Sequence, residues 1–438
     1  MSRINECILY RDFSQGQLLR QMDDLMEHRD EEWDDHRKEE WFFCLHELAE
    51  LAGQYGFFGN LWHAYLTFLL VSHENPFSKA CEIRGQVEGS INELARHDFA
   101  IFRELFALDL TALDRKAGGN CAGYFTDYRH EDGNSREFNH RIRDRIVETA
   151  ACLAASADVQ EFWQHMVDFY KDFGVGKFGL HKAFRIVHDE KGQVVISPIT
   201  RIAHVQLEDL VGYENAKQKL LENTEAFVSG RRANNCLLFG DAGTGKSSSI
   251  KGILNRYYDR GLRIIEVYKH QLQDLNEVIA QVKNRNYRFI LYMDDLSFEE
   301  FETEYKYLKA VIEGGLEKKP ENILIYATSN RRHLVRERSS DKLELMDDDD
   351  LHSSDTVQEK LSLVYRFGVR IYFGKPDKKE FQHIVKVLAE RHGVNMPEDR
   401  LFLLANQWEL SHGGLTGRTA QQFIDHLLGS ASLPDVQQ

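Results

Sequence analysis

A glycine-rich segment in the second half of the chain, residues 240–247, has the residue types that bind phosphate groups. It matches G-x-x-x-x-G-K-[ST] at every fixed position, between an apolar run at 236–239 and a segment compatible with a helix. The glycines let backbone N–H groups face the phosphates, and the helix N-terminus adds partial positive charge. We expect nucleotide contacts from eight residues: Gly240, Asp241, Ala242, Gly243, Thr244, Gly245, Lys246 and Ser247.

Two carboxylates follow the apolar run at 289–293, about fifty residues after the glycine-rich segment. They are Asp294 and Asp295. In sites of this kind a lysine of the loop reaches the β- and γ-phosphates, and the loop hydroxyl and a carboxylate at the end of a strand hold Mg²⁺. We therefore expect Lys246 to contact the phosphates of ATP, and Ser247 and Asp294 to hold the metal ion.

The base that orients the attacking water is expected to be a carboxylate beside this metal site. Asp295 is the leading candidate, although its side chain is one methylene shorter than that of glutamate. Glu299 or Glu300 is the alternative, because both follow a few residues later.

Five unbroken apolar runs predict the strands that must position these residues. Runs without alternation are typical of parallel strands that are buried on both faces, and the spacers are long enough for crossover helices. The runs lie at 236–239, 262–267, 289–293, 323–327 and 369–373. We predict an α/β domain with a five-stranded parallel sheet at 200–376 and a helical lid at 377–438.

The first 180 residues have a different pattern. Their apolar residues recur at helical spacing, and residues 1–200 hold 34 acidic and 22 basic side chains of a chain whose net charge is −15. We predict an acidic, mainly helical domain at 1–180 and a hairpin at the junction, 181–199. This charge disfavours nucleic acid as a partner.

The cysteines and the apolar segments indicate where such a protein would be found. The 6 cysteines are far apart and none forms a CxxC pair, which fits a reducing compartment. The polar residues 1–11 do not resemble a signal peptide, and no apolar stretch is long enough to span a bilayer. We expect a cytoplasmic protein without membrane contact.

Taken in the order in which they occur along the chain, the motifs of the second half resemble those of AAA+ ATPases. Val211 and Gly212 resemble the segment on the adenine side of the nucleotide, and Asn330 resembles the polar residue called sensor 1. The stretches DDLSFEE and SNRRHLV resemble a bacterial AAA+ group catalogued as domain of unknown function 815. The resemblance covers about residues 195–430 and implies a P-loop ATPase fold that uses ATP and Mg²⁺.

Two arginines also match positions of the AAA+ pattern. Arg366 resembles the arginine finger, which acts on the nucleotide of a neighbouring subunit, and Arg418 resembles the sensor 2 arginine of the lid. Arg331 and Arg332 are rival fingers. The resemblance thus implies catalytic roles for Asp295, Asn330 and Arg366, and a homo-oligomer, with a hexameric ring as one option.

The resemblance favours an ATPase that remodels or loads a protein partner. One alternative is a nucleotide-gated scaffold that binds ATP with little hydrolysis, because AAA+ proteins usually have Asp-Glu where this chain has Asp294 and Asp295. A second alternative is a nucleic-acid motor or helicase loader. The sequence identifies neither the client nor the role of the acidic stretch at 337–359.

Overall fold

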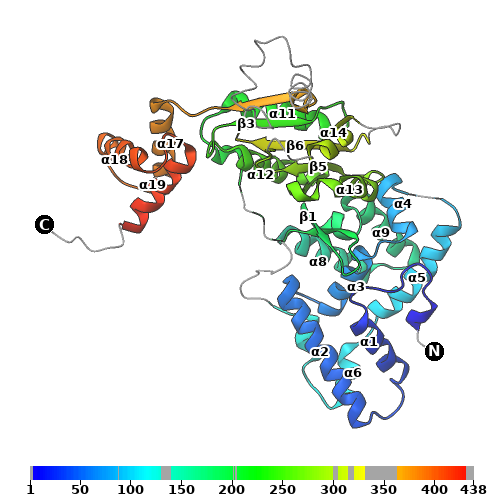
Figure 1. Ribbon diagram of the computed structural model, residues 1–438. Helices are drawn as coiled ribbons and strands as arrows, with labels where there is room; N and C mark the ends of the chain where they lie inside the picture. The colour runs from blue at the N-terminus through cyan, green and yellow to red at the C-terminus, as the bar shows by residue number, and fades with distance from the viewer. Residues whose placement is uncertain are drawn as a thin grey trace. The chain divides into compact units, whose positions relative to one another are not determined.

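The computed structural model describes residues 3–86, 88–129, 140–200, 202, 205–298, 304–313, 320–330 and 363–430. The chain divides into two compact units, Met1–His181 and Lys182–Gln438. The helices of the first unit and the sheet of the second are seen in Figure 1. Among the described residues, no helix is both long and apolar enough to cross a membrane.

The first unit is built from helices. Asn60 and Asp158 show how they begin: each is an N-cap whose side chain accepts a hydrogen bond from the backbone N–H three residues later. The helices are η1 (Arg3–Glu6), α1 (Gln17–Glu27), α2 (Asp35–Tyr55), α3 (Leu61–Ser72), α4 (Pro76–Arg84), α5 (Ser90–Phe106), α6 (Leu110–Ala117), α7 (Ala122–Thr126), α8 (His140–Ala155), α9 (Val159–Phe173) and α10 (Gly176–Leu180).

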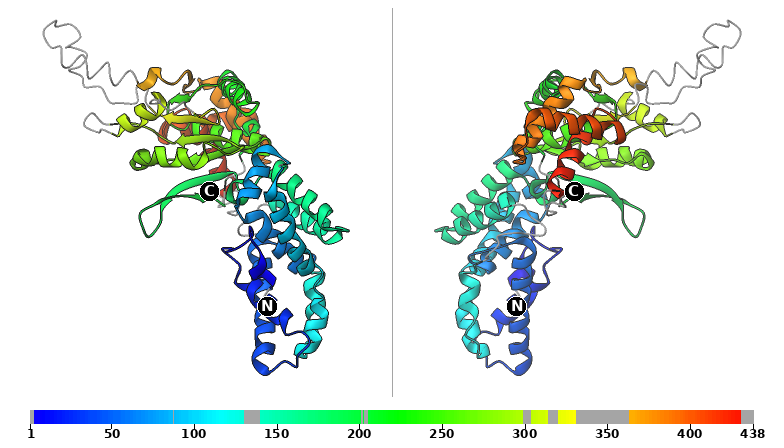
Figure 2. Two further views of the ribbon diagram at one scale, coloured as in Figure 1. Left: turned by 90° about the vertical axis from the view of Figure 1, so that its right-hand side faces the viewer. Right: turned by 90° about the vertical axis from the view of Figure 1, so that its left-hand side faces the viewer.

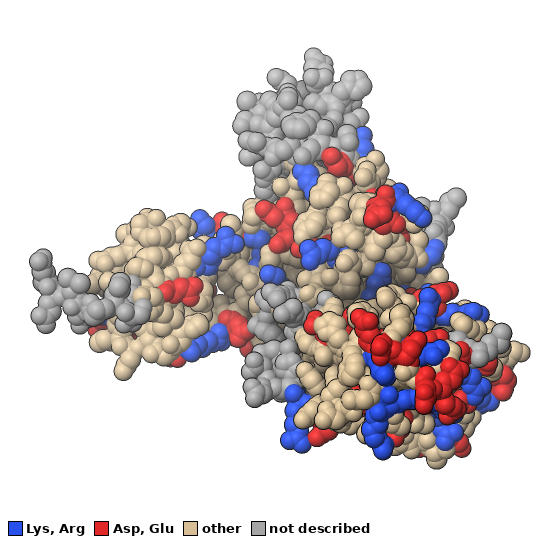
Figure 3. Space-filling model, turned by 90° about the horizontal axis from the view of Figure 1, so that it is seen from below, with Lys and Arg blue, Asp and Glu red and all other residues tan. Residues whose placement is uncertain are grey.

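Aromatic side chains fill the core of the first unit. Trp41, Trp62 and Trp163 are at most 1% exposed, and α3 is buried over most of its circumference. Buried Asp98 accepts hydrogen bonds from the backbone N–H groups of residues 8–10 and so fixes the N-terminal segment. Acidic and basic side chains are interspersed on the face of this unit seen in Figure 3.

The second unit contains a seven-stranded sheet, not the five-stranded sheet that the sequence predicts. Its order is β2-β1-β4-β5-β6-β3-β7. The five predicted runs are all strands and run parallel. The strands are β1 (Ala183–His188), β2 (Val194–Pro198), β3 (Cys236–Gly240), β4 (Leu262–Glu266), β5 (Arg288–Met293), β6 (Ile323–Ser329) and β7 (Val369–Phe373).

The two additional strands come from the predicted junction hairpin. β1 pairs in parallel with β4 through Ala183, Phe184 and Arg185, and β2 pairs antiparallel with β1. The hairpin therefore begins the second unit and extends its sheet. Figure 2 shows its tip extending beyond the other strands.

Helices of the second unit cover the sheet, and a group at the C-terminal end forms a separate bundle (Figure 1). The helices beside the sheet are η2 (Leu207–Asp209), α11 (Glu214–Val228), α12 (Lys246–Tyr257), η3 (Tyr258–Arg260), η4 (Lys269–Asp274), α13 (Leu275–Val282) and α14 (Tyr305–Glu313). The bundle, here called the lid, consists of α17 (Lys378–Arg391), α18 (Glu398–Ser411) and α19 (Gly417–Ser430), with its own core around Phe381, Ala405 and Phe423.

Candidate nucleotide site

The glycine-rich loop joins β3 to α12, and three of its glycines are required by the geometry. Gly240, Gly243 and Gly245 have φ values of 135°, 76° and 91°, which side chains rarely adopt. A β-carbon at Gly240 would lie 2.1 Å from the carbonyl oxygen of Phe373, and one at Gly245 would lie 2.3 Å from Leu210 Cδ2. The loop is therefore packed tightly between β7 and the segment that precedes α11.

Lys246 is the first residue of α12, and its side chain folds back along the loop. Its Nζ donates hydrogen bonds to the carbonyl oxygens of Gly240 (3.0 Å) and Asp241 (2.6 Å) and to Oδ1 of Asn330 (2.9 Å). Burial lowers the pKa of Lys246, while the carboxylates of Asp295, Asp241 and Asp294 oppose that shift. These bonds hold the ammonium group of Lys246 at the loop.

Asp294, directly after β5, accepts three hydroxyl hydrogen bonds at one oxygen, Oδ1. The donors are Ser247 Oγ at 2.7 Å, Tyr292 at 2.7 Å and Thr328 Oγ1 at 2.6 Å. Burial raises the pKa of Asp294, but the hydrogen bonds from Thr328, Tyr292 and Ser247 together outweigh it and hold the pKa below its ordinary value. The carboxylate is therefore ionised.

Asp295 and Asn330 complete a polar chain across the ends of β5 and β6. Asn330 Nδ2 donates to Asp295 Oδ1 at 2.7 Å, while Oδ1 of the same Asn330 accepts from Lys246. Asp295 has φ 48°, and its backbone N–H donates to Thr328 Oγ1 at 2.9 Å. A non-glycine residue in this conformation is uncommon and is often found at functional sites.

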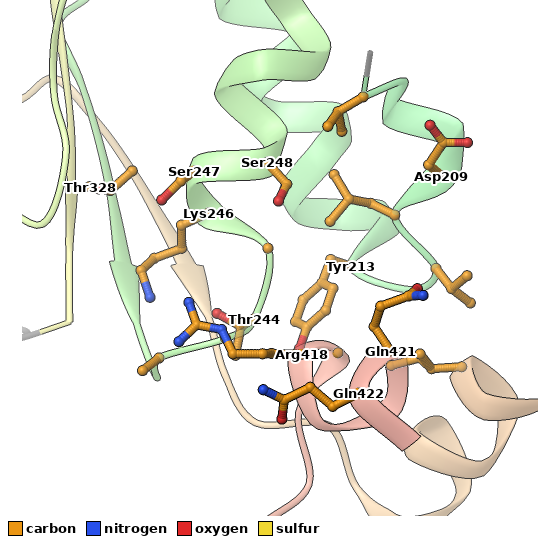
Figure 4. Close-up of a pocket in the computed structure, with 18 of the residues that line it drawn as sticks. Asp209, Tyr213, Thr244, Lys246, Ser247, Ser248, Thr328, Arg418, Gln421 and Gln422 are labelled. Atoms are coloured by element: carbon orange, nitrogen blue, oxygen red, sulfur yellow. The ribbon is translucent and has the colours of Figure 1, made fainter. Parts of the chain in front are cut away.

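A cavity of about 760 Å³ lies between the loop and the lid. Most of the sequence-predicted residues line it: Val211, Ala242, Gly243, Thr244, Gly245, Lys246, Ser247, Asp294, Asp295, Asn330 and Arg418. Figure 4 shows Arg418 extending from α19 toward Lys246. This volume lies within the range of small-molecule sites.

Four of the predicted residues that the structure describes do not line this cavity: Gly240 and Asp241 at the start of the loop, Gly212 and Arg366. Gly212 lines a neighbouring cavity of about 460 Å³, which shares Tyr213 with the larger one. Arg366 lies three residues before β7, and its guanidinium forms an ion pair with Glu313 at the end of α14. Among the described residues that line the two cavities, Arg366 is absent.

Two further residues of the site escape motif analysis, whereas Tyr213 belongs to the segment with Val211 and Gly212 that resembles the adenine side. Tyr292 and Thr328 bind Asp294, and only the pairing of β5 with β6 reveals that they are neighbours. Tyr213 has φ 61°, and burial raises its pKa to about 12. Its hydroxyl is buried without a hydrogen-bond partner in the part of the chain that the structure describes. The alternative residues Glu299, Glu300, Arg331 and Arg332 and the stretch 337–359 lie outside the described residues.

Residues 180–431 match the family described as "Protein of unknown function (DUF815)". The chain belongs to this family. The match contains the whole glycine-rich loop, the residues around Asp294 and the whole lid. In the matched segment, the glycine-rich loop lies between a strand of the parallel part of the sheet and a helix.

The chain is also similar to proteins of other names. It is 27% identical over 109 residues to chaperone protein ClpB of Mycoplasma genitalium, which covers 21% of this chain and 15% of that protein. The Thermotoga maritima RuvB Holliday junction branch migration motor is 18% identical (TM-score 0.35, 52% of this chain and 65% of that one). C. elegans PCH-2 is 17% identical (TM-score 0.34, covering 52% and 65%). The chain thus spans about a seventh of ClpB and less than two thirds of the two solved structures.

Proposed function

We propose that this chain binds ATP with Mg²⁺ in the cavity between the loop and the lid and hydrolyses it to ADP and phosphate. The observation that carries the proposal is the polar chain Lys246–Asn330–Asp295 beside the Ser247–Asp294 pair, all lining one cavity. It places an ammonium group, a carboxylate–hydroxyl pair and a second carboxylate around the same space.

The residues present fit a magnesium ion. The Ser247 hydroxyl donates a hydrogen bond to Asp294, which leaves the lone pairs of the Ser247 oxygen for a cation, and Asp294 is ionised. Mg²⁺ is usually bound through one or two protein ligands together with the substrate's phosphates, so a hydroxyl and one carboxylate suit it. When bound, Mg²⁺ neutralises charge on the phosphate oxygens.

The remaining roles follow from charge and hydrogen-bonding capacity. Lys246 leaves its carbonyl partners to meet the β- and γ-phosphates, and Arg418 adds positive charge from the lid. Asp295 accepts the proton of the attacking water or orients that water. Asn330, which binds both Lys246 and Asp295 in the structure, links the position of the phosphates to that of the base.

We further propose that the protein works as a homo-oligomer, such as a hexameric ring, on a protein client in the cytoplasm. Its six free cysteines fit a reducing compartment. The first unit is the candidate client-binding part. Its exposed Phe42 and Phe58, unlike the buried Trp41, are available for an interface. The excess of acidic side chains in residues 1–200 makes a nucleic-acid motor the weaker alternative.

A nucleotide-gated scaffold is the second candidate function, and one observation favours it. The short side chain of Asp295 already binds Asn330, and its backbone is held in the left-handed region. Such a carboxylate has less reach toward water than a glutamate. The two functions differ in turnover and share nucleotide binding.

Calorimetric ATP titration and steady-state phosphate release on the full chain test these alternatives. Lys246→Ala should lose ATP affinity, whereas Asp295→Asn should keep affinity and lose about 10²–10⁴-fold in turnover if Asp295 is the base. The Asp295→Asn variant can also be used to capture partner proteins in the presence of ATP. A wild-type chain that binds ATP but releases no phosphate, both alone and with these captured proteins, would establish the scaffold. If wild type and Lys246→Ala both fail to bind ATP, the nucleotide assignment is wrong.

A further inference from the structure

Hydrogen bonds of Arg418 and Arg391 join the lid to the rest of the second unit. Arg418 donates only its backbone N–H, to the carbonyl oxygen of Gly243 (3.2 Å). Just before the lid, Lys375 likewise donates only its backbone N–H, to Asp241 Oδ2 (3.2 Å). Arg391, in the last turn of α17, uses its side chain, so a substitution can remove this contact.

Arg391 binds the end of η2 with both terminal nitrogens of its guanidinium. One donates to the carbonyl oxygen of Asp209 at 2.8 Å and the other to that of Glu208 at 2.7 Å. The last carbonyl groups of a helix carry partial negative charge and have no partner within the helix. A permanently charged, forked donor matches two adjacent carbonyl oxygens, as lysine does not.

The segment that Arg391 holds is part of the cavity wall. Asp209, Leu210 and Val211 all line the cavity, and Leu210 packs against Gly245 of the loop. Upstream, Leu207 is buried and so close to α12 that a β-carbon at Gly252 would lie 2.8 Å from Leu207 Cγ. The segment is thus fixed to the loop helix on one side and to Arg391 on the other.

The lid helix carries the opposite wall. Ile384 and Leu388 of α17 line the cavity, and they precede Arg391 by seven and three residues, so the three residues share one face of the helix. Holding Arg391 on η2 therefore brings Ile384 and Leu388 opposite Leu210 and Val211. These apolar residues form the walls of the cavity on the sides of η2 and of the lid.

We propose that Arg391 is a latch that closes the lid over the bound nucleotide and sets how long the nucleotide stays. The proposal rests on the proposed function, since it takes ATP as the occupant of the cavity. Arg391 acts through η2 and the apolar walls and does not line the cavity itself, so it is a positioning residue. Its loss should speed nucleotide release more than it slows association, because the encounter with the phosphate loop does not require the latch.

The test compares three lid variants of the full chain. Arg391→Ala removes both hydrogen bonds, Arg391→Lys keeps the charge without the fork, and Arg400→Ala removes an arginine of α18 that is exposed and has no ion pair or hydrogen bond within the described residues. Dissociation of a fluorescent ATP analogue is followed by stopped flow, and thermal unfolding checks the fold. Hydrogen exchange of residues 206–211 without nucleotide reports on the latch itself.

We expect Arg391→Ala to release the analogue about 5- to 20-fold faster, with faster exchange at 206–211 and unchanged thermal unfolding. Arg391→Lys should recover part of the loss, and Arg400→Ala should match wild type. Equal release and exchange in Arg391→Ala, Arg400→Ala and wild type would overturn the latch while leaving the nucleotide site intact. A wild-type chain that binds no analogue would overturn both proposals.

Discussion

At the scale of single residues, the site depends on one carboxylate oxygen that receives three hydroxyl hydrogen bonds. Ser247, Tyr292 and Thr328 all donate to Asp294 Oδ1. Burial, together with the charge of Asp294, raises the pKa of Tyr292, so its hydroxyl keeps its proton and remains a donor. In the proposed magnesium site, Tyr292 thereby holds Asp294 in the orientation in which Ser247 can share the ion with it.

Replacing Tyr292 with phenylalanine tests this arrangement. Tyr292→Phe should require more Mg²⁺ for half-maximal ATP turnover and should be roughly tenfold slower at limiting Mg²⁺, because a hydrogen bond to a charged group contributes about 1.5–3 kcal/mol. Nucleotide binding without Mg²⁺ should be unchanged, since Lys246 and the loop are not altered. Magnesium titrations of phosphate release measure the effect.

Tyr326→Phe is the matched control for that measurement. Tyr326 pairs in register with Tyr292 on the adjacent strand β6 and is also buried, but its hydroxyl bonds with Asn223 and Thr224. The two variants lose the same atom from neighbouring strands. If both shift the magnesium dependence equally, Tyr292 has no particular role at Asp294.

These residues also mark how far the sequence predicts the site. The glycine-rich loop and Asp294 are found from the sequence because their chemistry requires fixed residue types at fixed local spacing. Tyr292 and Thr328 meet only through the register of β5 and β6, and Arg391 meets η2 from more than 180 residues away. No local spacing encodes such contacts, so they require the folded chain.

At the scale of elements, local sequence likewise predicts the five buried strands but does not reveal that the hairpin joins their sheet. Unbroken apolar runs indicate strands buried on both faces, which holds for β5 and β6. β1 has the burial pattern of a strand that is covered only in part, and it pairs with β4 across about eighty residues. The local sequence of the hairpin therefore does not reveal that it pairs with β4.

A pair of substitutions in β1 tests whether the hairpin stabilises the sheet. Phe184 is 0% exposed and lies in the part of β1 that pairs with β4, whereas Val187 is 37% exposed and pairs only with β2. In the full chain, Phe184→Ala should cost about 3–5 kcal/mol of unfolding free energy, as burial in a core predicts. Val187→Ala should cost less than about 0.5 kcal/mol.

Chemical denaturation that is monitored through the second unit measures both values. ATP affinity, measured separately, should change little in either variant, because no residue of β1 lines the cavity. An effect of Phe184→Ala as small as that of Val187→Ala would show that the hairpin adds little to the sheet.

At the scale of the whole molecule, the role of Arg366 offers a test of the proposed homo-oligomer. Within the chain its guanidinium pairs with Glu313 and is absent from the cavity lining. Two explanations fit this position: an ion pair that fastens the start of β7 to α14, or a finger that serves the nucleotide of a neighbouring copy. A partly exposed ion pair contributes little to stability, whereas an arginine finger contributes about 10³–10⁵ in rate.

Variants of the two partners separate these explanations. If Arg366 is a finger, Arg366→Ala should lose at least 10³-fold in ATP turnover and keep ATP affinity, while Glu313→Ala should retain most of the turnover because it leaves the guanidinium in place. If the ion pair matters for structure alone, both variants should lose a similar, small amount of stability and activity. Phosphate release and thermal unfolding of the full chains measure both.

Mixed assemblies then test whether Arg366 acts between copies. Arg366→Ala retains an intact loop, and Lys246→Ala retains an intact Arg366, so a mixed assembly contains sites with one functional half from each variant. Mixing the two inactive chains should restore part of the ATP turnover, with a maximum near equal proportions. Light scattering and tagged co-purification establish that the two chains share assemblies. Shared assemblies without recovered turnover would exclude an action of Arg366 on its neighbour's nucleotide.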